Sequence, residues 1–338
     1  MSVNFTLPEM YDKRKPSVFA AMFLYMLATA GLLLAPLVAY PLSFLFSLLF
    51  PNITLETLNC ISQAVYFALF LLLPIVLYVK KHPSSAVIMR INPISAKEAA
   101  WCVLAAVIGM FFVLYISFIW SILIEVFGGS IPDSGITLPK TAGGMLPMII
   151  VFAVMTGVSE ELLFRGVMLG AWEQKGSLRA MIISSMWFTF LHASIEGIPA
   201  QFISGLILSF VVISTNSIFA GMIYHTVYNA ANLILSFSVS NAAVQEAVVV
   251  SGTTLESIGG AMGLFIVFMY ILFLGALLLF VLKRIDAIRI RSERFEFGYA
   301  PMARREFDIK EVLLITVCAI SIFMLYMVNL LEIAGVIA

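Results

Sequence analysis

The sequence contains about nine apolar segments, each about as long as a helix that crosses the hydrocarbon layer of a membrane. The chain is 62% hydrophobic and only 11% charged, which is far more apolar surface than a soluble domain of 338 residues buries. We therefore predict an all-α, polytopic transmembrane helical bundle. Its spans are expected at residues 17–40, 61–79, 99–127, 145–172, 178–194, 200–216, 217–240, 260–282 and 311–333.

Three segments of this arrangement have more than one interpretation. The apolar piece 41–51 is too short to cross alone, so it is either an extension of the first helix or a re-entrant segment. The basic residues before the first apolar run also resemble the start of a signal peptide, but the run continues towards Tyr40, so we expect a retained first helix. The break between the sixth and seventh spans rests on the uncharged polar residues 214–217.

The basic residues indicate one orientation. Cytoplasmic loops carry the excess of lysine and arginine in multi-pass proteins. With the N-terminus inside, every Lys and Arg falls on the inner side except Lys140, which lies outside, and Arg165, which lies within a span. We predict a cytoplasmic N-terminus and an outer C-terminus, in the plasma membrane of a bacterium or an endomembrane of a eukaryote.

Composition limits the classes of partner. The net charge is zero and no basic tract contains interleaved aromatics, so nucleic acid is excluded as a partner. The three cysteines show neither disulfide nor metal spacing. A basic cytoplasmic loop at 283–310 is expected to be a solvated linker near anionic lipid headgroups. We divide the chain into 1–144 with three spans, a core at 145–240 with four spans, and 241–338 with two spans.

Three ionisable residues interrupt the predicted span 145–172. An ionisable residue at bilayer depth costs about 2.5–3.5 kcal/mol, so each is read first as a candidate functional residue. Glu161 and Arg165 are four residues apart and can pair on one helical face. Glu160 points to a neighbouring face and needs another partner. A purely structural ion pair is the alternative, but it does not require the second acid.

Two other predicted spans carry polar residues. In the fifth span, Phe188 and His192 are four apart and share a face. In the seventh, His225, Asn229 and Asn232 follow the spacing i, i+4, i+7 and form one polar stripe on an apolar helix. A single buried histidine is more often a packing residue than a catalyst, so the argument depends on whether these residues meet.

Depth along the helices indicates that the polar residues of the three spans meet. At a rise of 1.5 Å per residue, Glu160 lies roughly 18 Å and His192 roughly 20 Å from the inner ends of their helices. His225 and Asn229 lie roughly 12 and 18 Å from the same side. We therefore expect these four residues in one layer of the membrane.

Such a layer is suited to hydrolysis in a secluded polar cavity. A carboxylate and an imidazole can activate water, while an imidazole and a carboxamide can donate hydrogen bonds to an oxyanion. No Ser/His/Asp arrangement, cysteine nucleophile or His-Glu-x-x-His motif occurs in a comparable context. Glu160, His192 and His225 are also an acceptable zinc ligand set, so zinc remains an alternative. We favour metal-independent water activation, because Asn229 suits an oxyanion donor better than a zinc ligand.

The three motifs together resemble those of a known family. Glu160-Glu161-x-x-x-Arg165, Phe188-x-x-x-His192 and His225-x-x-x-Asn229 are similar in order and spacing to the motifs of the CPBP intramembrane proteases, which include the Rce1-type CAAX prenyl endopeptidases and the bacterial bacteriocin-processing or Abi proteins. The resemblance covers about residues 145–240. It implies a base at Glu160 acting with His192 on water, oxyanion donors at His225 and Asn229, and supporting roles for Glu161 and Arg165. We also expect Phe188 and Asn232 to support the site.

The resemblance implies an intramembrane endopeptidase of a metalloprotease family. Its partners would be the lipid bilayer and a peptide or lipidated-peptide substrate, either of the prenylated CAAX type or a leader peptide. We expect the cavity to open towards the cytoplasmic side or laterally to lipid. The alternative function is a non-proteolytic membrane regulator or bacteriocin-immunity protein that binds a partner through the same pocket. A transporter is disfavoured, because no internal repeat or pair of broken helices is evident.

Overall fold

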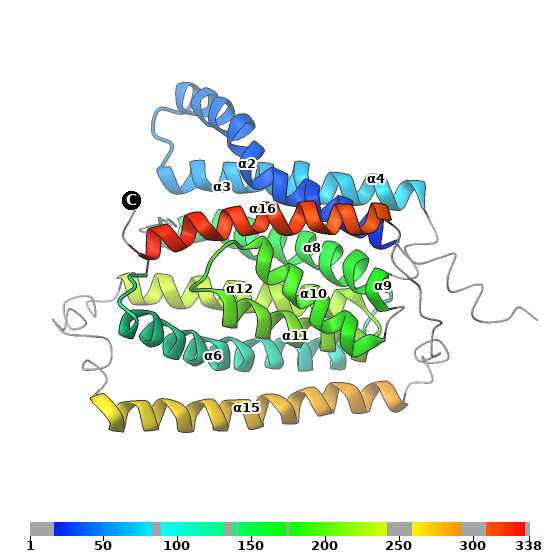
Figure 1. The fold of residues 1–338 in the computed structure, drawn as a ribbon. Helices are drawn as coiled ribbons and strands as arrows, with labels where there is room; N and C mark the ends of the chain where they lie inside the picture. The colour runs from blue at the N-terminus through cyan, green and yellow to red at the C-terminus, as the bar shows by residue number, and fades with distance from the viewer. Residues whose placement is uncertain are drawn as a thin grey trace, which may run out of the picture.

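A computed structural model describes residues 17–82, 89–131, 137–139, 141–173, 176–241, 259–291 and 309–334. Within these residues all regular structure is helical, which confirms the predicted all-α fold (Figure 1). The elements are α2 (Val18–Leu49), α3 (Leu55–Tyr66), η1 (Phe67–Leu72), α4 (Leu73–Lys81), α6 (Ala96–Val126), α7 (Ala142–Met148), η2 (Ile149–Met155), α8 (Thr156–Glu161), η3 (Leu162–Met168), α9 (Leu169–Trp172), α10 (Ser177–Leu191), α11 (Ile198–Thr215), α12 (Ile218–Asn241), α15 (Gly260–Arg291) and α16 (Ile309–Ile333).

The chain is an integral, multi-pass membrane protein. Among the described residues, seven helical segments are long and apolar enough to cross a membrane, and α10 is a shorter apolar helix. The segments η1, η2 and η3 are π-helical and interrupt two of these long helices without breaking them. The count of nine spans and the side of the N-terminus stay predictions.

The first helix includes the short apolar piece at its end. Helix α2 begins after Ser17, whose hydroxyl accepts a hydrogen bond from the Ala20 N–H, and it continues to Leu49. The piece 41–51 is therefore largely an extension of this helix. Pro36 and Pro41 lie inside α2 and remove backbone hydrogen bonds. Figure 1 shows the second half of α2 bending away from the bundle.

Two further predicted boundaries can be compared with the structure. Helix α11 ends at Thr215, and Asn216 then adopts a left-handed conformation with φ of 50° before α12 begins. This confirms the predicted turn between the sixth and seventh spans. The predicted loop 283–310 is corrected at its start, because α15 remains helical through Arg291. Residues 292–308 lie outside the described part of the chain.

A segment between α4 and α6 closes one end of the bundle. The Ile218 N–H donates to the Arg90 carbonyl at 2.8 Å, and the Asn92 side-chain amide donates to the Asn216 carbonyl at 2.8 Å. The Arg90 guanidinium also pairs with Glu173, just beyond α9. These contacts tie three helix ends together at the side where α10 begins.

A second set of contacts fixes the loop that joins α10 to α11. The Ile195 N–H donates to Oδ1 of Asn329 on α16 at 2.7 Å, and the Trp120 indole on α6 donates to the Ile195 carbonyl at 2.9 Å. Ala193 in the same loop has a left-handed φ of 48°, a conformation that favours glycine. Both backbone polar groups of Ile195 are thus bonded to helices distant in sequence.

This loop provides a test of stability. Replacing Asn329 with Leu is expected to lower the free energy of unfolding by about 1–3 kcal/mol, because the partly buried Ile195 N–H loses its acceptor. Thermal unfolding of the purified protein in detergent measures the change. Ser321→Leu is the matched control, since Ser321 lies exposed on the same helix. Equal melting temperatures for the two variants would show that the contact contributes nothing.

Candidate active site

The two adjacent glutamates lie in a short α-helical segment between two π-helical segments. Glu160 and Glu161 are the last residues of α8, with η2 before it and η3 after it. Wide turns leave carbonyl groups open to other donors. The Asn229 amide donates to the Phe152 carbonyl in η2 at 3.3 Å, and the Ser184 hydroxyl donates to the Phe164 carbonyl in η3 at 2.8 Å. Such π-helical turns occur frequently at functional sites.

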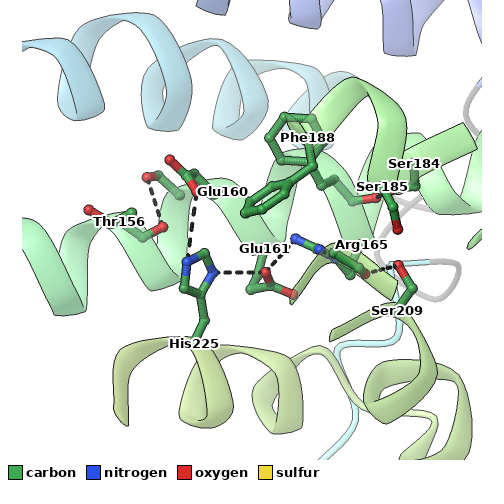
Figure 2. Close-up of polar contacts among 12 residues, drawn as sticks. Thr156, Glu160, Glu161, Arg165, Ser184, Ser185, Phe188, Ser209 and His225 are labelled. Atoms are coloured by element: carbon green, nitrogen blue, oxygen red, sulfur yellow. Dashed lines mark hydrogen bonds and ion pairs between the residues drawn. The ribbon is translucent and has the colours of Figure 1, made fainter. Parts of the chain in front are cut away.

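Glu161 is the centre of a fully buried polar cluster. Its Oε1 accepts hydrogen bonds from Nη1 of Arg165 at 2.7 Å and from Nδ1 of His225 at 3.0 Å (Figure 2). The other end of the guanidinium donates to the Gly205 carbonyl at 3.1 Å. The pair predicted from the i, i+4 spacing is confirmed. It is not self-contained, however, because the same carboxylate also holds a histidine.

This contact decides how His225 presents its ring. A carboxylate paired with arginine only accepts hydrogen bonds, so Nδ1 of His225 is the donor. The second nitrogen, Nε2, then faces Oε2 of Glu160 at 3.8 Å. That separation is too long for a hydrogen bond. Oε2 of Glu160 is buried and has no hydrogen-bond partner within the protein.

A cavity of about 110 Å³ adjoins these groups. A water molecule needs only roughly 10–15 Å³ of such space, so the cavity has room for several waters. The structure places Glu160, His192, His225 and Asn229 together on its wall, as the layer argument predicts. The full lining consists of Thr156, Glu160, Phe188, His192, Ala200, Gln201, Ser204, Leu208, Tyr224, His225, Tyr228 and Asn229.

His192 lies at the end of α10, where the helix passes into the loop fixed by Asn329. Its Nδ1 lies 2.8 Å from the Phe188 carbonyl, which only accepts, so this nitrogen carries the hydrogen. Nε2 is therefore the ring nitrogen that is available to a water molecule in the cavity. The Phe188 ring packs against the imidazoles of both His192 and His225, at centroid distances of 4.8 and 5.9 Å.

Glycines allow α12 to approach the carboxylates. A Cβ atom on Gly157 would lie 2.6 Å from Oγ1 of Thr226, and one on Gly221 would lie 2.6 Å from Oε2 of Glu161. Both distances are shorter than any ordinary contact. Side chains at these two positions would push α12, and with it His225, away from Glu161.

Several cavity residues were not predicted from the sequence. Thr156 lies one turn before Glu160, and Gln201 and Ser204 share a face of α11, so their spacing held a weak signal. No local pattern indicates Trp120 or Asn329, which act from outside the predicted core. Asn232, predicted as a supporting residue, does not line the cavity.

Metal binding is the remaining question about this site. Among the residues that the structure describes, no three His, Cys, Asp or Glu side chains are grouped closely enough to hold a metal ion. Zinc binding by Glu160, His192 and His225 stays a prediction.

The comparison with protein families bears on the same helices. The model of one family, the Rce1-like type II CAAX prenyl endopeptidases, matches residues 142–231. These residues are an Rce1-like domain. For this part of the chain, the match confirms the predicted resemblance to the CPBP and CAAX protease family. No match was found among the curated proteins or the solved structures.

The Rce1-like domain contains both glutamates, both histidines of the cavity and Asn229. At the family level the match supports a CAAX-type intramembrane protease. Trp120 and Asn329 lie outside the domain, so its loop after His192 depends on helices that the family match does not include.

Proposed function

We propose that the protein is an intramembrane endopeptidase in which Glu160 and His192 activate a water molecule for attack on a peptide bond. One observation carries the proposal. Oε2 of Glu160 is buried without a protein partner on the wall of a cavity that His192 also lines. An unsatisfied buried carboxylate oxygen is costly, and a bound water would satisfy it.

The proposed reaction conserves every proton. His192 orients the water through Nε2. The water oxygen bonds to the substrate carbonyl carbon while Glu160 takes one proton from the water. The tetrahedral intermediate then collapses as the C–N bond breaks. Glu160 returns the proton to the leaving amine, in the way that one general base serves as the later general acid.

The oxyanion would be stabilised from α12. The Asn229 amide has two N–H groups, one of which donates to the Phe152 carbonyl, so the second remains for the substrate oxygen. Nε2 of His225 donates to the same oxygen when it carries a proton. Glu161 and Arg165 would act indirectly, because they fix the ring of His225 through Nδ1.

A comparison of two histidine variants tests this function. We expect His192→Ala to lose most cleavage, because a positioned acid or base contributes about 10²–10⁴-fold to rate. His82→Ala is the matched control, since His82 lies exposed beyond the end of α4. Mass spectrometry of products from a single-span reporter protein and a farnesylated CAAX peptide, each incubated with purified protein in liposomes, provides the measurement. Undiminished cleavage by His192→Ala would refute the proposed role.

Treatment with a chelator tests the metal-independent version. We expect turnover in the same liposomes to be unchanged after exhaustive chelation, because Glu160 and His192 suffice in the proposed reaction. Metal analysis of the treated protein verifies that the ions have been removed. Loss of turnover that added zinc restores would instead support the ligand set Glu160, His192 and His225.

A further inference from the structure

The cavity has a closed floor. On the side of Glu160 and His225 where α10 begins, the next side chains are buried. Glu161, Arg165 and Phe164 have no exposed surface, and Phe188 is only 3% exposed. The Arg165 guanidinium lies 4.5 Å from the centroid of the Phe188 ring and covers it. No substrate chain reaches Glu160 through this layer.

The opposite side of the cavity lies near the loop between α10 and α11. The lining residues of α11 come from its first turns, beginning with Ala200 and Gln201. His192, at the end of α10, also lines the cavity, and its side chain is exposed. The cavity therefore extends from a buried floor towards the end of the bundle where this loop lies.

The contacts of this loop show which end that is. Ile195 bonds to Trp120, near the end of α6, and to Asn329, near the end of α16. The ends of α6 and α16 also meet directly, because the Ser130 N–H donates to the Ile333 carbonyl at 3.0 Å. Figure 1 shows the C-terminal end of α16 on the side away from the end of α15.

The basic residues lie at the other end. Within the described ranges, the lysines and arginines outside the buried cluster gather where α4 and α15 end and where α6, α10 and α16 begin. They are Lys80, Lys81, Arg90, Lys97, Arg179, Lys283, Arg284 and Lys310, with Arg289 and Arg291 at the end of α15. Cytoplasmic ends of transmembrane helices carry this excess of positive charge. By this rule the floor of the cavity faces the cytoplasm and its mouth faces away from it, which differs from the cytoplasmic or lateral opening expected from the sequence.

From this geometry we infer that the site receives substrate from the extracytoplasmic side. The inference rests on the proposed function and specifies its substrate class, a peptide bond in the outer half of the bilayer or just beyond it. A processed leader or the outer flank of a single-span protein has such a bond. A prenylated C-terminus made in the cytoplasm is anchored in the cytoplasmic leaflet, on the side of the closed floor.

Thiol labelling tests the direction of access independently of catalysis. Ser194→Cys places a thiol in the loop at the mouth, and Leu178→Cys places one at the other end of the same helix, where Leu178 is 69% exposed. The three native cysteines are buried, so the wild type provides the background. We expect a membrane-impermeant maleimide to label Ser194→Cys in intact cells, and Leu178→Cys only after permeabilisation. The reverse pattern would overturn the inference.

Cleavage of two reporters tests the substrate class. One is a single-span protein with its cleavable segment on the extracytoplasmic side, and the other is a farnesylated CAAX peptide offered to the cytoplasmic side of inverted vesicles. We expect the first to be cleaved and the second to remain intact. Cleavage of the second alone would overturn the inference and retain the proposed function. Outer labelling without cleavage of either would support the access route and contradict the proposed function.

Discussion

Glu160→Gln is expected to lower kcat by about 10²–10⁴-fold, the contribution typical of a positioned general base. Glutamine keeps the shape and hydrogen-bonding capacity of the side chain but does not accept the proton from water. Because Oε2 of Glu160 has no hydrogen-bond partner in the protein, the substitution breaks no hydrogen bond of this oxygen and weakens only its 3.8 Å contact with Nε2 of His225. Steady-state cleavage of a reporter by purified protein in liposomes measures the effect.

Two controls make this result specific. Glu125→Gln changes a glutamate near the end of α6 that does not line the cavity, and it is expected to leave kcat unchanged. Thermal unfolding shows whether the Glu160→Gln protein is folded. A folded Glu160→Gln protein with wild-type kcat would remove Glu160 from the reaction. A folded, inactive protein would also serve to trap bound substrate for identification.

Arg165→Met is expected to destabilise the protein by about 3–5 kcal/mol, the cost of leaving one member of a buried ion pair without its partner. Glu161 would remain as a carboxylate with no exposed surface, opposed only by His225. The Gly205 carbonyl would lose its donor as well. Unfolding in detergent, followed by circular dichroism, measures the loss.

The double variant Glu161→Gln with Arg165→Met separates charge from packing. If the uncompensated carboxylate causes the instability, neutralising it should recover a large part of the lost free energy, because neutral replacements of buried pairs are often well tolerated. An additive loss in the double variant would show that the cluster contributes through packing and hydrogen bonds alone. Neither outcome depends on a cleavage assay.

Much of the architecture is predictable from this sequence because the membrane imposes a simple length rule. Apolar runs locate the helices, and the polar residues 214–217 locate the turn at Asn216. The rule fails where a helix leaves the apolar layer. Helix α15 continues through charged residues to Arg291, since lysine and arginine are good helix formers and propensity does not end at the membrane surface.

The site is predictable where two of its residues lie on the same face of one helix. The spacing of Glu161 and Arg165, and that of His225 and Asn229, places each pair on one face. Pairing between helices is not encoded in this way. The bond from His225 to Glu161 depends on how closely α12 approaches α8, and the bond from Asn329 to Ile195 joins residues 134 positions apart.

The π-helical segments on either side of the glutamates have a consequence for insertions and deletions. Each π turn contains about one residue more than an α turn, so it shifts the register of everything beyond it. Removing one residue from η2 would restore a regular helix and rotate the segment before it by about 100° relative to Glu160. The altered chain would keep all three motifs intact, yet Phe152 would no longer meet Asn229. The three motifs alone therefore do not determine the geometry of the site. The number of residues in the helix before Glu160 also determines it.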